Sequence, residues 1–267
     1  MVITSAQATQ FVAEGAVTLN TPFTSDQVAA ASAAIDLLLP HKEADDGEPH
    51  RYRFSATCNF YDPAFLDLLQ HPFLETVAKT VLRADRVVFL QAAAIVAYPQ
   101  PEGPFTFDQH IDLQYTHSDL EASPRRIVCT FFLWLSDVTA TRSPLMYRPG
   151  SHRQLAKHWQ QQPELQGCLP RVQGMRQSDL PDLPFSEAQP LLARAGQGTV
   201  LTTAMVHGAS VNLDEHPRKA LVVTFSADSV TVVLPKAQAE AKAAFEARLG
   251  ALLRIERRHL LRSDKTQ

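Results

Sequence analysis

The chain has 267 residues, of which 45% are hydrophobic, and a formal net charge of −3 at pH 7. This length and apolar content allow one large domain with a sizeable core, and the slightly acidic balance excludes the basic field that a nucleic-acid-binding protein needs. No apolar run approaches the length of a membrane-spanning helix, and the N-terminus lacks the pattern of a signal peptide. The 3 cysteines share no metal-ligand spacing and are typical of a reducing compartment, so we expect a cytoplasmic protein.

The first third of the sequence is predicted to be mainly helical. Thr4 and Gln7 stand three positions apart before an apolar stretch, as the two partners of a capping box do where a helix begins. Gly15 is placed to end that helix. Further helices are predicted from the spacing of apolar residues and from prolines, over residues 24–40, 62–70 and 72–82. Residues 1 to about 85 are therefore assigned to a helical N-terminal part.

Short strand patterns follow from residue 86 onward. The strongest is the run from Ile127 to Leu135, which is dense in β-branched and aromatic residues. Other strands are predicted at residues 86–97, 105–115, 143–148, 191–193, 199–203, 207–211, 218–226 and 230–234. A proline-rich excursion over residues 154–190 interrupts the series, and long excursions of this kind are often lids over functional sites.

The order of the elements predicts the fold class. Helices come first, many strands follow, and an amphipathic helix over about residues 236–262 closes the chain. Because strands and helices do not alternate as βαβ units, a doubly wound parallel sheet is not expected. The sequence predicts a mainly β protein with flanking α-helices, built as a double-stranded β-helix, or jelly roll, of the cupin-like type. We expect a single domain with its jelly-roll core over about residues 86–234.

A histidine and an aspartate two positions apart, His110 and Asp112, lie in the predicted strand 105–115. Residues i and i+2 of a strand point to the same face, so the imidazole and the carboxylate converge. A 2-His-1-carboxylate facial triad needs one more histidine from a distant strand. His207, near a strand junction and followed by Gly208, is the best candidate. Glycine there lets the backbone approach a ligand closely.

An arginine, Arg218, opens a strongly apolar strand eleven residues after His207. Its guanidinium cannot be buried there without an anionic partner, and the planar fork suits a carboxylate. A histidine–aspartate pair on a strand is by itself more often structural than metal-binding. The arrangement of the second histidine and the arginine is what favours a metal site.

Together with Pro149-Gly-Ser-His152, these residues resemble the phytanoyl-CoA dioxygenase family, the non-haem iron(II)- and 2-oxoglutarate-dependent oxygenases with a jelly-roll core. The resemblance spans most of the chain. It implies that His110, Asp112 and His207 bind Fe(II) and that Arg218 holds the distal carboxylate of 2-oxoglutarate. It also implies a dioxygenase that uses O2, releases succinate and CO2, and hydroxylates a small organic molecule. Halogenating members have a small residue where this chain has Asp112, which favours hydroxylation here.

The chain departs from the family pattern at two places. Members often carry a hydroxyl residue two positions after the second histidine, where this chain has Ala209. The candidates for that second anchor of 2-oxoglutarate are Ser210, Thr202 and Gln91. Members often have tryptophan directly before the first histidine, where this chain has Gln109. The candidates for substrate contacts are Gln109, Gln114, Tyr115 and Tyr98.

Two alternative hypotheses stay open. A non-catalytic or regulatory β-sandwich binding protein that kept the fold is suggested by Gln109 and Ala209. A cupin-type metalloenzyme that does not use 2-oxoglutarate would leave Arg218 without a role. The expected partner is a small-molecule substrate, with no nucleic acid and no membrane, and the protein is expected to be a monomer or a homodimer. The sequence does not identify the substrate or the site of oxidation.

Overall fold

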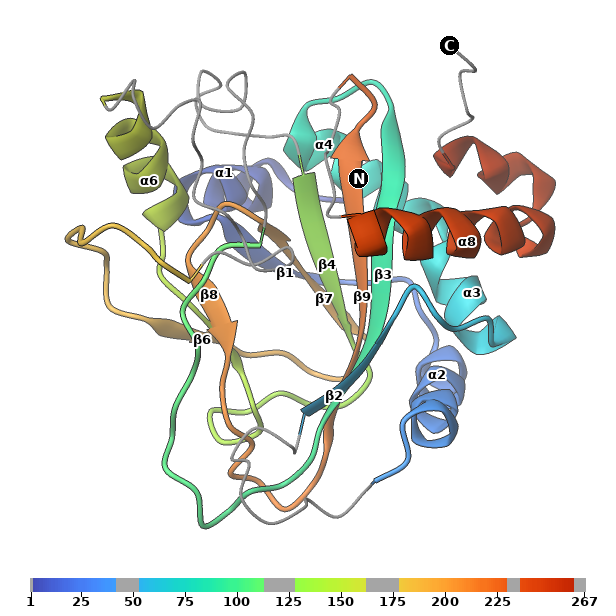
Figure 1. The fold of residues 1–267 in the computed structure, drawn as a ribbon, viewed down its shortest axis with the longest axis horizontal. Helices are drawn as coiled ribbons and strands as arrows, with labels where there is room; N and C mark the ends of the chain where they lie inside the picture. The colour runs from blue at the N-terminus through green and yellow to red at the C-terminus, as the bar shows by residue number, and fades with distance from the viewer. Residues whose placement is uncertain (1, 42–52, 113–127, 162–177, 230–235, 262–267) are drawn as a thin grey trace.

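A computed structural model describes residues 2–41, 53–112, 128–161, 178–229 and 236–261, and in these parts two antiparallel sheets form the body of the protein (Figure 1). The large sheet has the strand order β1-β7-β4-β9-β3-β2, and the small sheet has the order β6-β5-β8. The strands of the large sheet are β1 (Ala16–Asn20), β2 (Arg53–Thr57), β3 (Val87–Ala97), β4 (Val128–Trp134), β7 (Gln197–Thr202) and β9 (Arg218–Ala227). Those of the small sheet are β5 (Leu145–Tyr147), β6 (Gln189–Leu191) and β8 (His207–Ala209). The predicted jelly-roll class is confirmed.

Helices cover the outer face of the large sheet. They are α1 (Ser5–Glu14), α2 (Ser25–Leu38), α3 (Pro63–Leu69), α4 (Pro72–Leu82) and α8 (Lys236–Leu252), followed by the 3-10 helix η1 (Ile255–Leu260). Their apolar side chains form one core with residues of the sheet such as Phe131 and Phe225. Helix α6 (Ser151–Gln160) lies apart from them, on the side of β8 (Figure 1). Among the described residues, no helix is long and apolar enough to cross a membrane.

The inner face of the large sheet packs against the small sheet. Phe132 and Trp134 of β4 belong to this second core, whereas Phe131 and Leu133, which alternate with them along the strand, belong to the helix-covered core. This alternation is the two-residue period of a strand. Because both faces of β4 are buried, its sequence is a continuous apolar run and not an alternating one. The space enclosed between the two sheets is therefore lined by every second residue of β3, β4, β7 and β9.

Local sequence signals set the helix ends. The predicted capping box of α1 is present, with reciprocal hydrogen bonds between Thr4 and Gln7, and Gly15 ends the helix in the left-handed region at φ 93°. The closing helix is shorter than predicted, because α8 ends at Leu252 and the chain turns into η1. There the buried guanidinium of Arg257 donates to the carbonyl oxygen of Gln70 and to Glu75. Those contacts hold the C-terminal segment against α3 and α4.

The predicted strand over residues 105–115 differs most from the observed structure. Over its described part, residues 105–112, the chain forms isolated bridges, at Phe107 with Ser210 and at His110 with His207. The predicted strand at residues 230–234 lies outside the described residues. The predicted excursion contains α6, and residues 178–188 form an irregular segment that packs on it.

Candidate metal centre

Main-chain hydrogen bonds bring His110 and His207 together. The amide of each histidine donates to the carbonyl oxygen of the other, both at 2.9 Å, and the amide of Asp112 donates to the carbonyl oxygen of Thr203 at 3.0 Å. Gly208 permits this pairing, because a Cβ atom there would lie 1.5 Å from the carbonyl oxygen of Asp108. The segment that approaches the main chain of Gly208 closely is therefore the one that carries His110.

The side chains of His110, Asp112 and His207 converge on one point. One ligand atom from each lies within 4.8 Å of the others. The Nε2 atom of His110 lies 3.4 Å from one carboxylate oxygen of Asp112, and the Nε2 atom of His207 lies 3.3 Å from the other. Both histidines are buried, and the Asp112 side chain is 29% exposed. The structure thus brings together the three ligands that the sequence predicted.

The main chain sets the orientation of both imidazole rings. The Nδ1 atom of His207 lies 2.8 Å from the carbonyl oxygen of Met205, and that of His110 lies 3.3 Å from the carbonyl oxygen of Asp108. Because a carbonyl oxygen only accepts, each ring is expected to carry a proton on Nδ1, which leaves the lone pair on Nε2 facing the carboxylate.

This arrangement requires a cation. Two neutral Nε2 acceptors that face carboxylate oxygens repel them unless a metal ion or a proton lies between. Burial raises the pKa of Asp112, but His207 and His110 outweigh it and lower that pKa below its usual range. Two nitrogens and one carboxylate on one side fit the facial triad of a non-haem iron site, with positions left open for other ligands.

An apolar cluster supports the metal-bearing segment from behind. Ile111, between the two ligands, is fully buried, and the side chains packed with it belong to α6, to the turn before His207 and to residues 178–188. They are Leu155, Trp159, Ala204, Val206, Leu180, Leu183 and Phe185. Because His110 and Asp112 point to one side and Ile111 to the other, this packing fixes the direction of both ligands.

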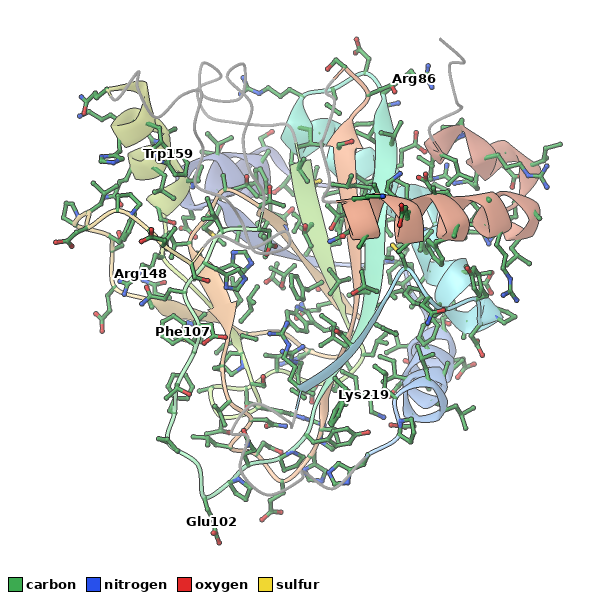
Figure 2. All side chains as sticks on the ribbon, in the orientation of Figure 1. Arg86, Glu102, Phe107, Arg148, Trp159 and Lys219 are labelled. Atoms are coloured by element: carbon green, nitrogen blue, oxygen red, sulfur yellow. The ribbon has the colours of Figure 1, made fainter. Side chains whose placement is uncertain are left out.

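Arg148 ties the same segment to residues 178–188. Its Nε donates to the side-chain oxygen of Gln109 at 2.5 Å, and its Nη1 donates to the carbonyl oxygen of Ser186 at 2.8 Å. Figure 2 shows Arg148 on the side of α6 and β8, between Trp159 and Phe107. Gln109, predicted to contact substrate, is thus held by Arg148. The role of Arg148 was missed, since nothing in the sequence marks it.

Arg218 projects into the second core from the first residue of β9. It is fully buried, its Nε donates to the carbonyl oxygen of Ser143 at 3.2 Å, and its Nη2 donates to the Ser143 hydroxyl at 3.3 Å. The guanidinium lies 5.6 Å from the centre of the Trp134 ring. Nη1 has no hydrogen-bond partner, and no carboxylate of the described residues pairs with this arginine. Burial, and then the charge of Arg53, lowers the pKa of Arg218 to about 9, so it stays charged at neutral pH.

Ser143, the partner of Arg218, is a second residue that the sequence did not reveal. It is fully buried and has a φ of 42°, a conformation that residues other than glycine rarely adopt. Its hydroxyl lies 2.6 Å from the carbonyl oxygen of Ser210, to which it donates, while both of its oxygens accept from Arg218. The positive φ has no signal in the sequence.

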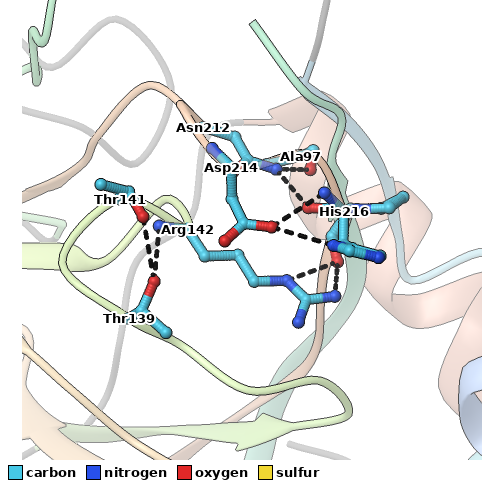
Figure 3. A network of polar contacts seen from close by, with 8 residues as sticks. Ala97, Thr139, Thr141, Arg142, Asn212, Asp214 and His216 are labelled. Carbon is cyan, nitrogen blue, oxygen red and sulfur yellow. Dashed lines mark hydrogen bonds and ion pairs between the residues drawn. The ribbon is translucent and has the colours of Figure 1, made fainter. Parts of the chain in front are cut away.

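A polar network fixes the turn that leads into β9 (Figure 3). The side-chain amide of Asn212 donates to the carbonyl oxygens of Ala97 and His216, both at 2.9 Å. Arg142 donates to the carbonyl oxygen of Pro217 through Nε at 3.2 Å and Nη2 at 2.8 Å. The two residues before Arg218 are therefore held, His216 by Asn212 and Pro217 by Arg142, and this fixes the start of β9.

The remaining predicted site residues lie in different surroundings. Ser210 is close to Arg218, since its carbonyl oxygen accepts from Ser143, but its own hydroxyl donates to the carbonyl oxygen of Pro144 at 2.8 Å. Thr202 pairs with Cys129, which belongs to the helix-covered core, so its side chain is on the outer face. Tyr98 also belongs to that core, and its hydroxyl donates to the carbonyl oxygen of Leu39. Gln91 is on the inner face but six positions along the sheet from Arg218, and Gln114 and Tyr115 lie outside the described residues.

The fold and the site define the class of protein. A jelly roll with a buried cluster of two histidines and one aspartate, and with an arginine inside the barrel, has the architecture of a cupin-like metalloenzyme. The family model "Phytanoyl-CoA dioxygenase (PhyH)" matches residues 11–220, and the chain belongs to this family. It is accordingly an Fe/2-oxoglutarate-dependent enzyme, and the expected cofactors, Fe(II), 2-oxoglutarate and O2, agree with the cluster.

Solved structures share the fold at low sequence identity. The epimerase SnoN, in complex with Fe3+, alpha ketoglutarate and nogalamycin RO, matches with a TM-score of 0.61 and 17% identity over 88% of each chain. AviO1 from Streptomyces viridochromogenes Tue57 matches with a TM-score of 0.62 and 18% identity, over 88% of this chain and 99% of that one. EctD from S. alaskensis, in its apoform, matches with a TM-score of 0.58 and 20% identity, over 87% and 80%. No curated protein matches the sequence.

Proposed function

We propose that the protein is a non-haem Fe(II)- and 2-oxoglutarate-dependent dioxygenase that hydroxylates a small organic molecule. The observation that carries the proposal is the pairing of two complementary features inside one barrel. One is the convergence of His110, Asp112 and His207 within 4.8 Å, and the other is the buried, partly unpaired cation of Arg218. A metal ion and a dianionic 2-oxo acid would satisfy both at once.

Each residue has a distinct proposed task. His110, Asp112 and His207 would hold the metal through two Nε2 atoms and a carboxylate oxygen, with both rings oriented by main-chain carbonyls. Arg218 would bind the distal carboxylate of 2-oxoglutarate with Nη1, while Ser143 keeps the rest of the guanidinium in place. Asp112 would occupy the third protein-ligand position on the metal, where a halide would otherwise have to bind.

The surroundings of the site suit an oxidative reaction. With the metal bound, the oxidative decarboxylation of 2-oxoglutarate by O2 to succinate and CO2 is coupled to oxidation of a substrate C–H bond. The inner-face side chains of Phe132, Trp134 and Val222 are apolar and buried, and they exclude water from the side of Arg218. Exclusion of water strengthens the ion pair that Arg218 would form.

The cofactor assignment is tested without a substrate. Purified protein is loaded anaerobically with Fe(II) and then with 2-oxoglutarate, and a metal-to-ligand charge-transfer band is expected in the visible spectrum. His110→Ala and Asp112→Ala should lose the band and the formation of succinate in air. His259→Ala is the matched control, because this histidine is exposed and its ring contacts are the carbonyl oxygen of Glu256 in η1 and the carboxylate of Glu75 in α4. An active Asp112→Ala variant would refute the triad.

The outcome of the oxidation needs a separate test, because SnoN is described as an epimerase. Small organic molecules are first screened for their ability to stimulate succinate formation. The product of a positive compound is then analysed by mass spectrometry under 18O2. Hydroxylation predicts that the product gains one oxygen atom that carries the label. A product of unchanged mass, or one that has lost two hydrogen atoms, would reject hydroxylation and leave the cofactor assignment standing.

A further inference from the structure

Three neighbouring strands of the large sheet carry polar residues on their inner face. Gln91 of β3 pairs with Thr224 of β9, which pairs with Thr130 of β4. Each stands two positions from a residue of the apolar inner core, Ala93, Val222 and Phe132 respectively, so all three side chains share that face. Side chains fill the interior of small barrels or leave room for one small ligand. The polar triplet, like the pair of Thr18 and Thr199, stands next to apolar inner positions.

The triplet lies at the end of the barrel opposite Arg218. Thr224 stands six positions after Arg218 in β9, which is about 20 Å of extended strand. The amide of Asp112 donates to the carbonyl oxygen of Thr203, the residue that follows β7. The last residue of β7, Thr202, pairs with Cys129 of β4. Cys129 is adjacent to Thr130 in β4. Asp112 and the polar triplet therefore lie at the same end of the barrel. A 2-oxo acid held by Arg218 is too short to reach the triplet.

The chemistry of the triplet is that of uncharged hydrogen bonding. The hydroxyl oxygens of Thr130 and Thr224 lie 3.0 Å apart, with 3% and 1% of these residues exposed. One hydroxyl donates to the other, which leaves the second hydroxyl proton available. The amide of Gln91 is partly exposed, has no hydrogen-bond partner among the described residues, and offers both donors and an acceptor.

The adjoining inner positions of these strands carry no charge. They are Val88, Val128 and Ser226. A carboxylate or an ammonium group placed against the triplet would lose its hydration without gaining a counter-charge from these strands. A hydroxyl or carboxamide group would pair with both Gln91 and the threonine pair.

We propose that Gln91, Thr130 and Thr224 form a substrate subsite that binds an uncharged hydroxyl or carboxamide group. The inference rests on the proposed function, since it places the substrate on the side of the metal ligands away from Arg218. It assigns Gln91 to the substrate and removes it from the candidates for the second 2-oxoglutarate anchor. The enzyme then acts on a small molecule that carries such an uncharged polar group.

The test uses the anaerobic complex of the protein with Fe(II) and 2-oxoglutarate. The probes are benzyl and cyclohexyl compounds, each as the alcohol, the carboxamide, the carboxylate and the amine. Their binding is followed by perturbation of the charge-transfer band. We expect the alcohols and carboxamides to bind at least about tenfold more tightly than the charged members. In Gln91→Leu and Thr130→Val, that binding should weaken roughly 3- to 10-fold, as expected for neutral hydrogen bonds.

A matched control is available in the same barrel. Thr18 and Thr199 form another cross-strand hydroxyl pair, at 2.9 Å, on β1 and β7. Thr18→Val should leave the selectivity unchanged. The subsite is wrong if the charged probes bind best, if no neutral probe binds, or if Gln91→Leu and Thr130→Val behave like wild type. Loss of the band in the wild-type protein would instead overturn the proposed function.

Discussion

Arg218 carries a full charge into the interior, where its contacts among the described residues are with Ser143 and the face of Trp134. A charged hydrogen bond contributes about 1.5–3 kcal/mol, which corresponds to roughly 10- to 150-fold in affinity. We therefore expect Arg218→Lys to raise the KM for 2-oxoglutarate by that factor and to leave the Fe(II) affinity unchanged, as measured by succinate formation and by anaerobic titration. Arg86→Lys, at an exposed pair with Asp228, is the control. An unchanged KM would mean that Arg218 does not bind 2-oxoglutarate, and the absence of succinate formation in the wild-type protein would favour a metalloenzyme that does not use it.

Gly208 is the residue on which the geometry of the metal centre depends most. Any side chain there would overlap with the main chain of Asp108 and would push the His110 segment away from β8. We expect Gly208→Ala to cost about 1–3 kcal/mol in the free energy of unfolding. We also expect it to weaken Fe(II) binding at least about tenfold, the size of effect seen when partners of metal ligands are lost.

The matched control for that substitution is Gly250→Ala in α8. A Cβ atom at Gly250 would meet only the end of the Leu261 side chain, at 3.4 Å. Alanine is favoured over glycine inside a helix by about 1 kcal/mol, so this variant should be neutral or stabilised. Chemical denaturation and anaerobic Fe(II) titration measure both effects. A Gly208→Ala protein that binds Fe(II) normally would contradict the close main-chain pairing.

At the scale of single residues, the sequence predicted those site residues whose positions follow a spacing or order along the chain. His110 and Asp112 follow from the two-residue period of a strand, and His207 and Arg218 from their order along the chain. Ser143 could not be predicted, because its role depends on a positive φ and on contacts with residues far away in the sequence. The second anchor of 2-oxoglutarate stays a prediction for a related reason, since the face on which Thr202 lies is known only from its register with Cys129.

At the scale of elements, the segment that carries His110 is positioned from outside. It forms bridges in place of a regular strand, so the apolar cluster around Ile111 and the hydrogen bond from Arg148 to Gln109 replace a ladder. Arg148→Ala removes the link to Gln109 and to Ser186. We expect the Fe(II) dissociation constant to rise roughly tenfold, at the low end of the effects of lost supporting contacts.

The control for Arg148 is Arg153→Ala, an exposed arginine on α6, close by in sequence. Its removal should leave Fe(II) affinity unchanged in the same anaerobic titration. Equal affinity of the Arg148→Ala and wild-type proteins would mean that the cluster around Ile111 alone holds the segment. This distinction matters because Arg148 is partly exposed, whereas Ile111 is fully buried.

The sequence predicted whole elements where one signal dominates. The capping box of α1 and the apolar run of β4 were located well, because each depends on neighbouring residues only. The end of α8 was not, since the turn into η1 is fixed by Arg257 and its contacts with Gln70 and Glu75. Those contacts join segments about 185 positions apart, and no local pattern records them.

At the scale of the molecule, helices close one face of the large sheet and leave the other to the metal centre. The corner at Gly150, Ser151 and His152 connects the two sides. The amide of Gly150 donates to the carbonyl oxygen of Glu14 in α1, and the Ser151 hydroxyl accepts from the amide of Val206, next to His207. His152 packs against Gly15, and its Nε2 lies 3.2 Å from the carbonyl oxygen of Val12. The N-terminal helix is thereby attached to the metal site.

This corner makes the stability of the whole fold depend on pH. His152 is 3% exposed, and its Nδ1 has no hydrogen-bond partner. Burial, opposed by the contact with Val12 and reinforced by Arg153, lowers the pKa of His152 to about 4. In the unfolded chain a histidine has a pKa of about 6.5. Between these values the unfolded state binds more protons, so the free energy of unfolding decreases as the pH falls.

Above about pH 6.5 we expect no loss of the free energy of unfolding from this residue. Toward pH 4 the free energy of unfolding decreases by up to about 1.4 kcal/mol per pH unit, for a total of roughly 3 kcal/mol. His152→Gln keeps a donor for Val12 and cannot be protonated, so its free energy of unfolding should fall less over this range. Urea unfolding of the metal-free proteins at several pH values measures the difference, with His41→Gln, at an exposed histidine whose ring packs on Tyr98, as the control. If His152→Gln and wild type lose stability in parallel, His152 does not couple protonation to the attachment of α1.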